Sequence, residues 1–440
     1  MAWRPAYIVL IVVSTAVDYT VSRLMMGYGI DDRRRKYLLA ISLVANLGLL
    51  FMFKYFNFFN DSLRQLFIYF DWRYPIADID VFLPVGISFY TFQTLSYTID
   101  VYRGKLVAEK HLGIFALYVA FWPQLVAGPI ERAGTLLPQL RSWVGFDYER
   151  VRAGLLKMGW GFFKKLVVAD RLSLYVNAIY NYPQNFDSGP ILLATFLFSF
   201  QIYCDFSGYS DIAIGAAKVL GYDLMENFER PYASQSITEF WRRWHISLST
   251  WFRDYLYIPL GGSRVVKWRW YVNVAIVFLV SGLWHGARWT FFVWGGLHTV
   301  YILGELIGKD FCQRWQINGV GMPAWLVKWL RMGVTFSLVT IAWLFFRANS
   351  FDDAMIIVRH LFVNFDNVGV FSRTTPVQLS LSLGLIAFLL GHEAYVESDL
   401  RQRSGWFASD FVRWGYYLML MLGLMWLGVF VNREFIYFRF

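Results

Sequence analysis

The sequence is poor in charge and in cysteine. Only 16% of its 440 residues are charged, whereas 57% are hydrophobic and 20% are aromatic. A soluble globular domain carries about 25% charged residues, so this composition excludes an ordinary soluble protein and predicts a polytopic membrane protein. The two cysteines, Cys204 and Cys312, lie in or near apolar segments without metal-ligand spacing. A disulfide framework is therefore not expected.

Several functional signatures are also absent. The chain has no G-x-S-x-G elbow, which argues against a serine hydrolase. No RNA- or DNA-binding motif accompanies the net charge of +10. In a membrane protein such a surplus is typical of cytoplasmic loops and of contact with the anionic headgroups of membrane lipids. No internal repeat or low-complexity linker divides the chain, so we predict one membrane domain over residues 1–440.

Hydrophobic runs follow one another along the whole chain. About 20 mostly apolar residues span a bilayer. The best candidates are Tyr37 to Phe53, Leu112 to Ile130, Ser188 to Cys204, Met332 to Phe346, Thr374 to Gly391 and Trp414 to Asn432. Shorter or interrupted runs are Pro5 to Val17, Val81 to Ile99, Trp270 to Trp284 and Trp289 to Gly304. We predict an all-α protein of roughly ten or more helices, some short or re-entrant and lining a central cavity.

One stretch, Ser236 to His285, holds two Trp-His dipeptides and the densest run of basic residues. Ser236 and Glu239 have the spacing of a capping box, so a helix is predicted to begin there and to end at Pro259. Its bulky apolar residues recur at intervals of three and four, which predicts one face: Trp241, Trp244, Leu248, Trp251 and Tyr255. With arginines mostly off that face, such a helix suits the membrane interface.

The same stretch predicts the orientation of the chain. Residues Arg230 to Arg269 include seven arginines or lysines against two carboxylates. By the positive-inside rule this stretch faces the cytoplasm, and topology accounts for most of the charge. A share in binding the phosphates of a polyanionic ligand stays open for Arg242 and Arg253.

His285 lies between two apolar runs, where an ionisable group is expensive to keep. A histidine beside tryptophan in a membrane protein is often only a hydrogen-bonded packing residue. On spacing alone, a catalytic role for His245 and His285 therefore stays open. Two other features have plain readings: Asp205 and Asp211 predict scaffolding carboxylates at a helix break, and Gly261-Gly262 predicts a turn.

Several motifs resemble those of the membrane-bound O-acyltransferase (MBOAT) family. The stretch from Glu239 to Arg264 resembles one family signature. Its sequence is E-F-W-R-R-W-H-I-S-L-S-T-W-F-R-D-Y-L-Y-I-P-L-G-G-S-R. The run S-G-L-W-H-G, Ser281 to Gly286, resembles a second signature, which carries the active-site histidine. Three further stretches resemble motifs of the bacterial branch of the family that modifies polysaccharides: Leu83 to Tyr90, Ala127 to Arg132 and Cys204 to Ala213. Relatives usually carry an earlier hydrophobic hairpin, which we expect to be missing here.

The resemblance implies an acetyltransferase of a bacterial inner membrane, with its helices around a central catalytic tunnel. It implies transfer from a cytoplasmic donor, acetyl-CoA, to an exported polysaccharide, with alginate as the first choice. Peptidoglycan O-acetylation, teichoic acid D-alanylation and a non-catalytic acyl or polysaccharide transporter remain alternatives. It also implies a secreted or membrane-anchored esterase-like partner. No tightly bound cofactor and no metal are expected.

The resemblance assigns roles to individual residues. It implies that His285 is the general base, because a positioned histidine best removes a hydroxyl proton near neutral pH. His245 would orient the donor or contribute a hydrogen bond. We expect Trp244, Trp284, Arg242 and Arg253 to bind substrate. The oxyanion-stabilising group is not identified by the sequence.

The C-terminal run, Phe435 to Phe440, is predicted to lie at the membrane boundary or to fold back into it. An aromatic interfacial anchor is one interpretation. The alternative resembles a terminal motif proposed for acyl relay in related export systems, with the phenol of Tyr437 as a covalent carrier.

Overall fold

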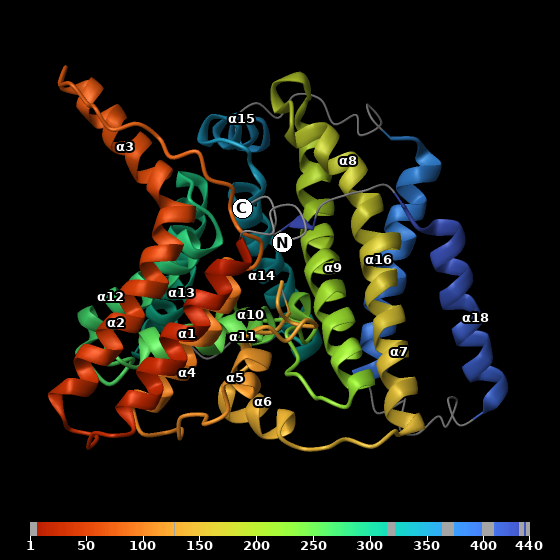
Figure 1. The fold of residues 1–440 in the computed structure, drawn as a ribbon. Helices are drawn as coiled ribbons and strands as arrows, with labels where there is room; N and C mark the ends of the chain where they lie inside the picture. The colour runs from red at the N-terminus through yellow and green to blue at the C-terminus, as the bar shows by residue number, and fades with distance from the viewer. Residues whose placement is uncertain are drawn as a thin grey trace.

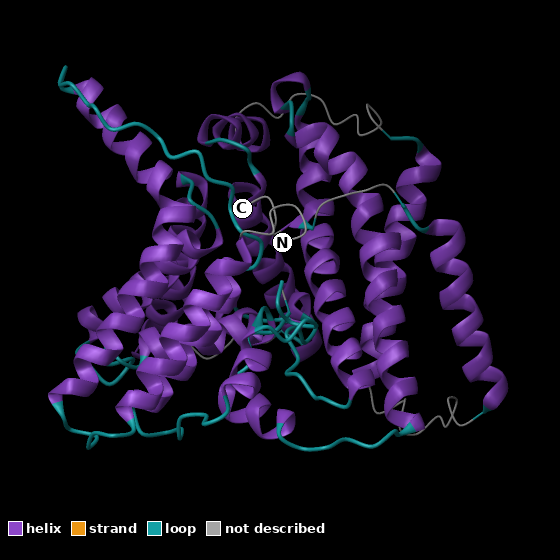
Figure 2. Ribbon diagram, in the orientation of Figure 1, coloured by secondary structure: helices purple, strands orange, loops and turns teal. Residues whose placement is uncertain are grey.

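The computed structural model describes residues 7–126, 128–314, 322–362, 374–397, 409–430 and 435–436. Within these ranges the chain is helical and contains no β-strand, which confirms the all-α prediction (Figure 2). Six helical segments of this part are long and apolar enough to cross a membrane: Ile8–Met25, Arg33–Tyr69, Ser188–Leu220, Trp289–Lys309, Ala324–Arg347 and Pro376–Val396. The chain is a multi-pass membrane protein.

The helices form two upright groups with shorter elements between them (Figure 1). The left group consists of α1 (Ile8–Met25), α2 (Arg33–Leu50), the π-helical turn η2 (Phe51–Tyr55), α3 (Phe56–Tyr69), α4 (Ile87–Tyr102), α12 (Lys267–His285) and α13 (Trp289–Arg314). The right group consists of α7 (Tyr148–Phe162), the π-helical turn η3 (Phe163–Ala169), α8 (Asp170–Tyr180), α9 (Ser188–Leu220), α16 (Pro376–Glu397) and α18 (Asp410–Leu427).

The remaining helices lie between the groups or across their ends (Figure 1). They are α5 (Leu112–Val119), α6 (Ala133–Leu140), α10 (Ile237–Arg243), α11 (Ile246–Phe252), α14 (Ala324–Arg347) and α15 (Phe351–Phe362), with short turns η4 (Pro183–Asn185), η5 (Pro231–Ala233) and η6 (Arg253–Tyr257). The prediction that some helices are short is thus confirmed: α5, α6, α10 and α11 are each far too short to span a bilayer.

A buried carboxylate ties the first helices together. Asp18 of α1 is fully buried and accepts hydrogen bonds from Asn46 Nδ2 of α2 at 2.9 Å and from Thr98 Oγ1 of α4 at 3.0 Å. Ser42 also donates to it. A buried carboxylate is tolerated only when its lone pairs are occupied in this way. This network fixes α4, whose first turn enters the functional site.

Two predicted spans are interrupted. The run Leu112 to Ile130 is helical only as far as Val119, and a turn follows at Phe121 to Val126. The run Val81 to Ile99 becomes helical only at Ile87. Pro123 and Pro129 in the first run, and Pro84 in the second, lack the amide hydrogen that a helix interior needs. The prediction of an uninterrupted span at Leu112 to Ile130 is therefore wrong.

The long segment α7–η3–α8 was not among the predicted spans, because lysines interrupt its apolar pattern. Their charges are paired with α9 and α8: Lys164 Nζ lies 2.5 Å from Asp211 Oδ2, and Lys165 Nζ lies 2.6 Å from Asp205 Oδ1 and 2.9 Å from Asp170 Oδ1. The predicted helix break between Asp205 and Asp211 is wrong, since α9 runs unbroken through both. The scaffolding role fits these ion pairs.

Glycines let α7 and α9 approach until their backbones touch. A Cβ placed on Gly161 would lie 2.6 Å from the carbonyl oxygen of Gly208, and one on Gly208 would lie 2.7 Å from that of Gly161. Gly154 and Gly215 form a second such pair, with a 2.7 Å approach. Small residues at helix contacts are the usual basis of close packing within membranes.

Replacing Gly161 with alanine should therefore lower the thermal stability of the purified protein, with a loss of about 1–3 kcal/mol from overpacking. Gly333→Ala on α14 is the matched control, because no atom lies within 4 Å of a Cβ added there and alanine favours a helix. Both variants are measured by thermal unfolding in the same detergent. Equal melting temperatures for Gly161→Ala and the wild type would contradict the close-packing argument.

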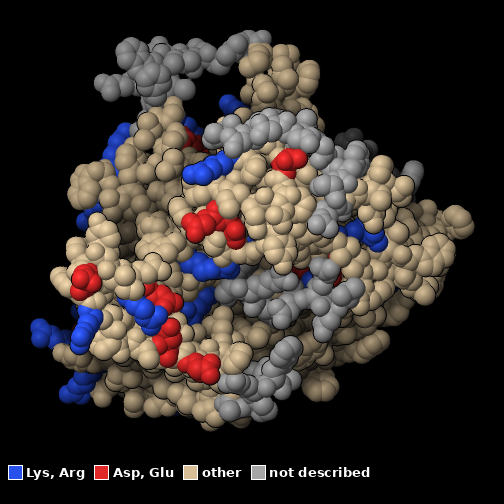
Figure 3. Space-filling model, turned by 90° about the horizontal axis from the view of Figure 1, so that it is seen from above, with Lys and Arg blue, Asp and Glu red and all other residues tan. Residues whose placement is uncertain are grey.

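Charged residues lie at both ends of the bundle. At the bottom of Figure 1 the α1–α2 turn leads into the basic run Arg33, Arg34, Arg35 and Lys36. The opposite face, viewed from above in Figure 3, mixes carboxylates with basic groups. The positive-inside rule predicts that the bottom end faces the cytoplasm.

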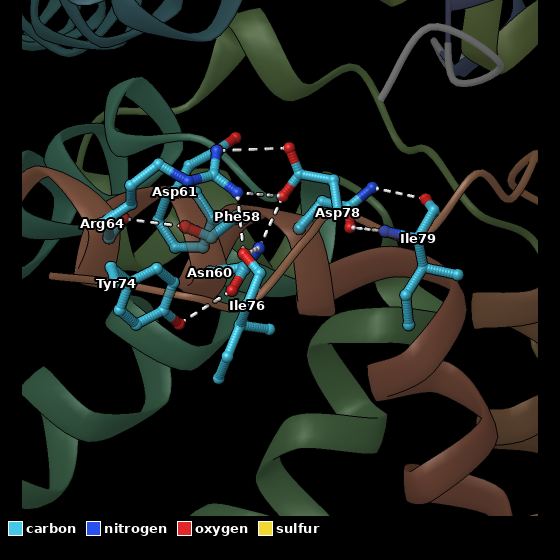
Figure 4. Close-up of polar contacts among 10 residues, drawn as sticks. Phe58, Asn60, Asp61, Arg64, Tyr74, Ile76, Asp78 and Ile79 are labelled. Carbon is cyan, nitrogen blue, oxygen red and sulfur yellow. Dashed lines mark hydrogen bonds and ion pairs between the residues drawn. The ribbon is translucent and has the colours of Figure 1, made fainter.

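A returning segment lies along α3, which projects at the upper left of Figure 1. The side-chain amide of Asn57 pairs with both backbone groups of Ile79, at 2.9 and 3.0 Å. Figure 4 shows a second contact, in which Arg64 NH2 donates to Asp78 Oδ1 at 2.9 Å. The hydrogen bond from Arg64 holds the pKa of the Asp78 carboxyl below its ordinary value. These contacts hold the chain that leads into Gly86 and the start of α4.

Candidate functional site

The predicted helix from Ser236 to Pro259 is broken at the first histidine. Ser236 Oγ accepts a hydrogen bond from Glu239 N at 3.1 Å, so the predicted N-cap is confirmed. The helix α10 then ends at Arg243, Trp244 is extended, and His245 takes a left-handed conformation with φ of 45° before α11 begins. The predictions of one continuous helix and of one interfacial aromatic face are therefore wrong.

Tertiary contacts explain the break. The indole of Trp244 is 1% exposed and packs against Phe240 and Trp343, with ring centroids 5.4 and 4.9 Å apart. A left-handed residue costs roughly 1–2 kcal/mol, and burying one large aromatic side chain offsets that cost. Trp244 therefore lies in the core and lines neither of the two cavities described below.

Asn227 fixes the orientation and tautomer of His245. Asn227 Oδ1 accepts hydrogen bonds from Ser247 N at 3.2 Å, from Ser247 Oγ at 2.9 Å and from His245 Nδ1 at 3.2 Å. A backbone N–H can only donate, so the Asn227 atom must be the oxygen, and Nδ1 of His245 carries a hydrogen. In the neutral ring Nε2 then holds the lone pair. Nε2 is buried and has no hydrogen-bond partner among the described residues.

His285 is the last residue of α12 and is 3% exposed. Aromatic rings surround its imidazole: the centroids of Trp284, Trp294 and Phe346 lie 5.0, 5.1 and 5.2 Å away. The ring of Trp284 also lies 6.2 Å from that of His245. The two histidines, far apart in sequence, thus pack against one tryptophan.

A large cavity approaches this region from one side. Its volume is about 820 Å³, and its cationic lining residues are Arg242, Arg253 and Lys309. Ser281, four residues before His285 and hence one helical turn away, also lines it. Arg242 and Arg253 therefore lie where a ligand of this cavity would meet them.

A second, smaller cavity lies against His285 itself. It measures about 40 Å³, and its lining includes Lys54, Ser88, Trp284 and His285. Gly86, also in its lining, has φ of 82°, and a Cβ there would lie 2.7 Å from the carbonyl oxygen of Leu125. Only glycine fits this position. A continuous tunnel joining the two cavities stays a prediction.

The Ala127 to Arg132 motif braces the neighbouring π-helical turn η6. Arg132 lies over the ring of Tyr255, 4.6 Å from its centroid, and its NH2 is 3.5 Å from Asp254 Oδ2. Glu131 is buried and accepts a hydrogen bond from Met225 N. Burial raises the pKa of Glu131 to about 7. This motif therefore supports the wall of the large cavity rather than lining it.

Two ionisable groups beside the site, the buried His298 and the half-buried Lys54, were missed from the sequence. His298 accepts a hydrogen bond from Trp241 Nε1 at its Nδ1, over 3.2 Å, and is fully buried. Lys54 meets the end of α12, and nothing in the linear order links it to His285. A signal existed for Lys54: it is a lone cation inside a long apolar run, and such residues are functional candidates by default.

The C-terminal segment folds back into the bundle in its described part. Phe435 and Ile436 are buried. Ile436 N donates to Asp205 Oδ2 at 2.7 Å, and the Phe435 ring stacks on Tyr209 at 4.9 Å. Tyr437 lies outside the described residues, so its relay role stays a prediction.

Comparisons with known proteins place the chain in a family. A model of the membrane-bound O-acyltransferase (MBOAT) family matches residues 110–347, which include both histidines. The chain is 39% identical over 348 residues to the probable alginate O-acetylase AlgI of Pseudomonas aeruginosa, covering 79% of this chain and 64% of that protein. The protein belongs to the MBOAT family.

Two further relatives widen the comparison. The probable alginate O-acetylase AlgI of Azotobacter vinelandii is 36% identical over 400 residues, covering 91% of this chain and 77% of that protein. The peptidoglycan O-acetyltransferase of Helicobacter pylori is 32% identical over 383 residues, covering 81% of this chain and 70% of that protein. The chain thus spans about two thirds to three quarters of the length of these relatives.

Proposed function

We propose that this protein is a membrane O-acetyltransferase acting on an exported polysaccharide, with alginate as the first candidate. It takes acetyl groups from acetyl-CoA on the cytoplasmic side of a bacterial inner membrane. The main observation behind the proposal is that two cavities reach the same end of α12. The large basic cavity reaches Ser281, and the small cavity contains His285 one turn later.

In this proposal the large cavity holds the acyl donor. Arg242, Arg253 and Lys309 supply the positive charge that a polyanionic coenzyme requires. By the positive-inside rule the basic stretch around them faces the cytoplasm, where acetyl-CoA is made. Trp284 separates the two histidines and lines the small cavity, so it would contact the reacting groups.

His285 is proposed as the general base. The acceptor hydroxyl attacks the thioester carbonyl carbon, and the imidazole takes the hydroxyl proton. The tetrahedral intermediate then breaks its C–S bond, and the imidazolium returns the proton to the leaving thiolate. His245 presents the lone pair of Nε2 in a buried setting and is proposed to orient the reacting groups.

The rival function is transport of acyl groups or glycan without chemistry. Broken helices and buried ionisable residues occur in transporters as well. The family membership and the names of the relatives favour transfer, because alginate O-acetylase and peptidoglycan O-acetyltransferase both denote acyl chemistry. Alginate is preferred over peptidoglycan because the AlgI relatives are more similar, and D-alanyl transfer to teichoic acid is the weakest alternative. The esterase-like partner and the role of Tyr437 belong to the same proposal.

The deciding experiment follows label from acetyl-CoA. Purified protein in liposomes, with and without an esterase-like partner, is given acetyl-labelled acetyl-CoA on one side and alginate on the other. We expect label to leave acetyl-CoA and to reach alginate only when both proteins are present. Movement of intact donor without thioester cleavage would identify a transporter, and full-rate acetylation by this chain alone would remove the need for a partner.

Variants of the cavity arginines test donor binding in the same assay. Arg242→Met or Arg253→Met should raise the KM for acetyl-CoA roughly tenfold or more, because a charge-assisted hydrogen bond contributes about 1.5–3 kcal/mol. Arg64→Met, on the projecting α3, removes one arginine far from both cavity linings and serves as the control. An unchanged KM in both cavity variants would place the donor elsewhere.

A further inference from the structure

Lys54 is bound to the end of α12 that carries His285. Its Nζ donates to the carbonyl oxygen of Trp284 at 2.7 Å and to that of His285 at 3.2 Å. A third, longer bond of 3.3 Å reaches Ser88 Oγ at the start of α4. The ammonium also lies 5.9 Å from the centroid of the Trp284 ring. One cation therefore contacts three components of the small cavity.

The π-helical turn η2 is what aims this side chain. It presents Lys54 and Tyr55 in succession toward α12, and Tyr55 Oη donates to the carbonyl oxygen of Leu283 at 3.0 Å. Two adjacent residues thus cap three successive carbonyls. π-helical turns within α-helices occur frequently at functional sites. Both side chains satisfy the helix end, but only Lys54 brings a charge and lines the cavity.

Capping alone does not account for a lysine at this position. A neutral donor such as the Tyr55 hydroxyl satisfies a carbonyl equally well, whereas a cation at membrane depth is expensive to keep. The reaction proposed above creates a negative charge beside His285, on the former carbonyl oxygen of the acyl group. Fixed donors or cations aimed at such an oxyanion are usually the largest single contribution to catalysis.

We propose that Lys54 and Ser88 together stabilise the oxyanion formed in the His285 cavity. Ser88 Oγ accepts from Lys54, so its own hydrogen is free to donate, and it has no acceptor among the described residues. The ammonium polarises that hydroxyl and adds its charge nearby. No bond to Lys54 or Ser88 forms or breaks; electrons move from the carbonyl π bond to oxygen and return when the C–S bond breaks. This inference rests on the proposed acyl transfer.

The test compares two adjacent residues that both cap α12. Lys54→Met keeps most of the length of the side chain but removes its charge and its N–H donors, and Tyr55→Phe removes only a capping hydroxyl. We expect Lys54→Met to lower kcat about tenfold or more with the KM for acetyl-CoA unchanged, because it removes the charge that polarises Ser88 but leaves the donating hydroxyl in place. Tyr55→Phe should stay within about threefold of the wild type, and Lys54→Arg should retain more activity than Lys54→Met. Equal small losses in Lys54→Met and Tyr55→Phe would reduce Lys54 to a cap.

Ser88→Ala keeps the inference testable if Lys54→Met unfolds. Ser88 caps no carbonyl of α12, so its variant should keep the wild-type melting temperature and lose about 10²–10³-fold in kcat, the loss typical of a missing oxyanion donor. An unchanged kcat in Ser88→Ala together with an unfolded Lys54→Met would overturn the inference. The variant His285→Ala separates the oxyanion assignment from the proposed general base. If it is inactive while Lys54→Met and Ser88→Ala are normal, only the oxyanion assignment fails; if it is active, the proposed base fails.

Discussion

Replacing His285 with alanine should abolish acetylation of the polysaccharide, lowering the rate by at least about 10²–10⁴-fold, the range that a general base contributes. Among the described residues that line the small cavity, the imidazole is the only titratable side chain besides Lys54. Its backbone is capped by Lys54 and its ring is enclosed by aromatic side chains, so truncation leaves the helix end in place. The protein level in the membrane should therefore be unchanged.

The measurement is acetyl transfer by membranes that contain equal amounts of each variant. His360→Ala, on α15 at the top of the bundle, is the matched histidine control and should behave like the wild type. The variant His285→Gln provides a second check, because it keeps a hydrogen-bonding side chain of similar size that cannot act as a base. Near-normal acetylation by His285→Ala would remove this histidine from the mechanism.

Replacing His245 with alanine should also impair acetylation severely, by about 10²-fold. Its Nε2 is buried without a hydrogen-bond partner among the described residues. A buried nitrogen that makes no hydrogen bond lowers the stability of the folded protein. We attribute that cost to the proposed orienting role of His245 beside Trp284. Because His245 packs against Trp284 rather than lining the His285 cavity, a residual rate is expected to survive.

The variant Asn227→Ala tests the same orienting role with a smaller expected loss of activity. It removes the acceptor that holds Nδ1–H and thereby frees the imidazole to adopt either tautomer. We expect a loss of about tenfold, smaller than in His245→Ala, because the ring itself remains. Both are measured as kcat and KM with acetyl-CoA, alongside melting temperature. Full activity in His245→Ala, or a larger loss in Asn227→Ala than in His245→Ala, would contradict the orienting role.

Much of this protein could be predicted from local sequence. The low charge and the repeated apolar runs predict an all-α membrane protein, because only helices satisfy their own backbone within a chain segment in lipid. The capping box at Ser236 was likewise readable, since it needs only a hydroxyl three residues before an acidic side chain. The Trp-His motifs carried the family resemblance, which the family model then confirmed.

The remaining features depend on partners that are distant in sequence. The break at His245 follows from Asn227 and from the burial of Trp244, neither of which periodicity can reveal. Lys164 and Lys165 interrupt the apolar pattern of a long helical segment, and the carboxylates that pair with them, on α9, are distant in sequence. Lys54 meets His285 only because η2 turns toward α12. Sequence alone thus determined that this chain is apolar and helical, since those properties are local, but it did not fix where each helix begins and ends. The tertiary structure decided which buried charges meet, because an ion pair or hydrogen bond forms between segments whatever their distance along the chain.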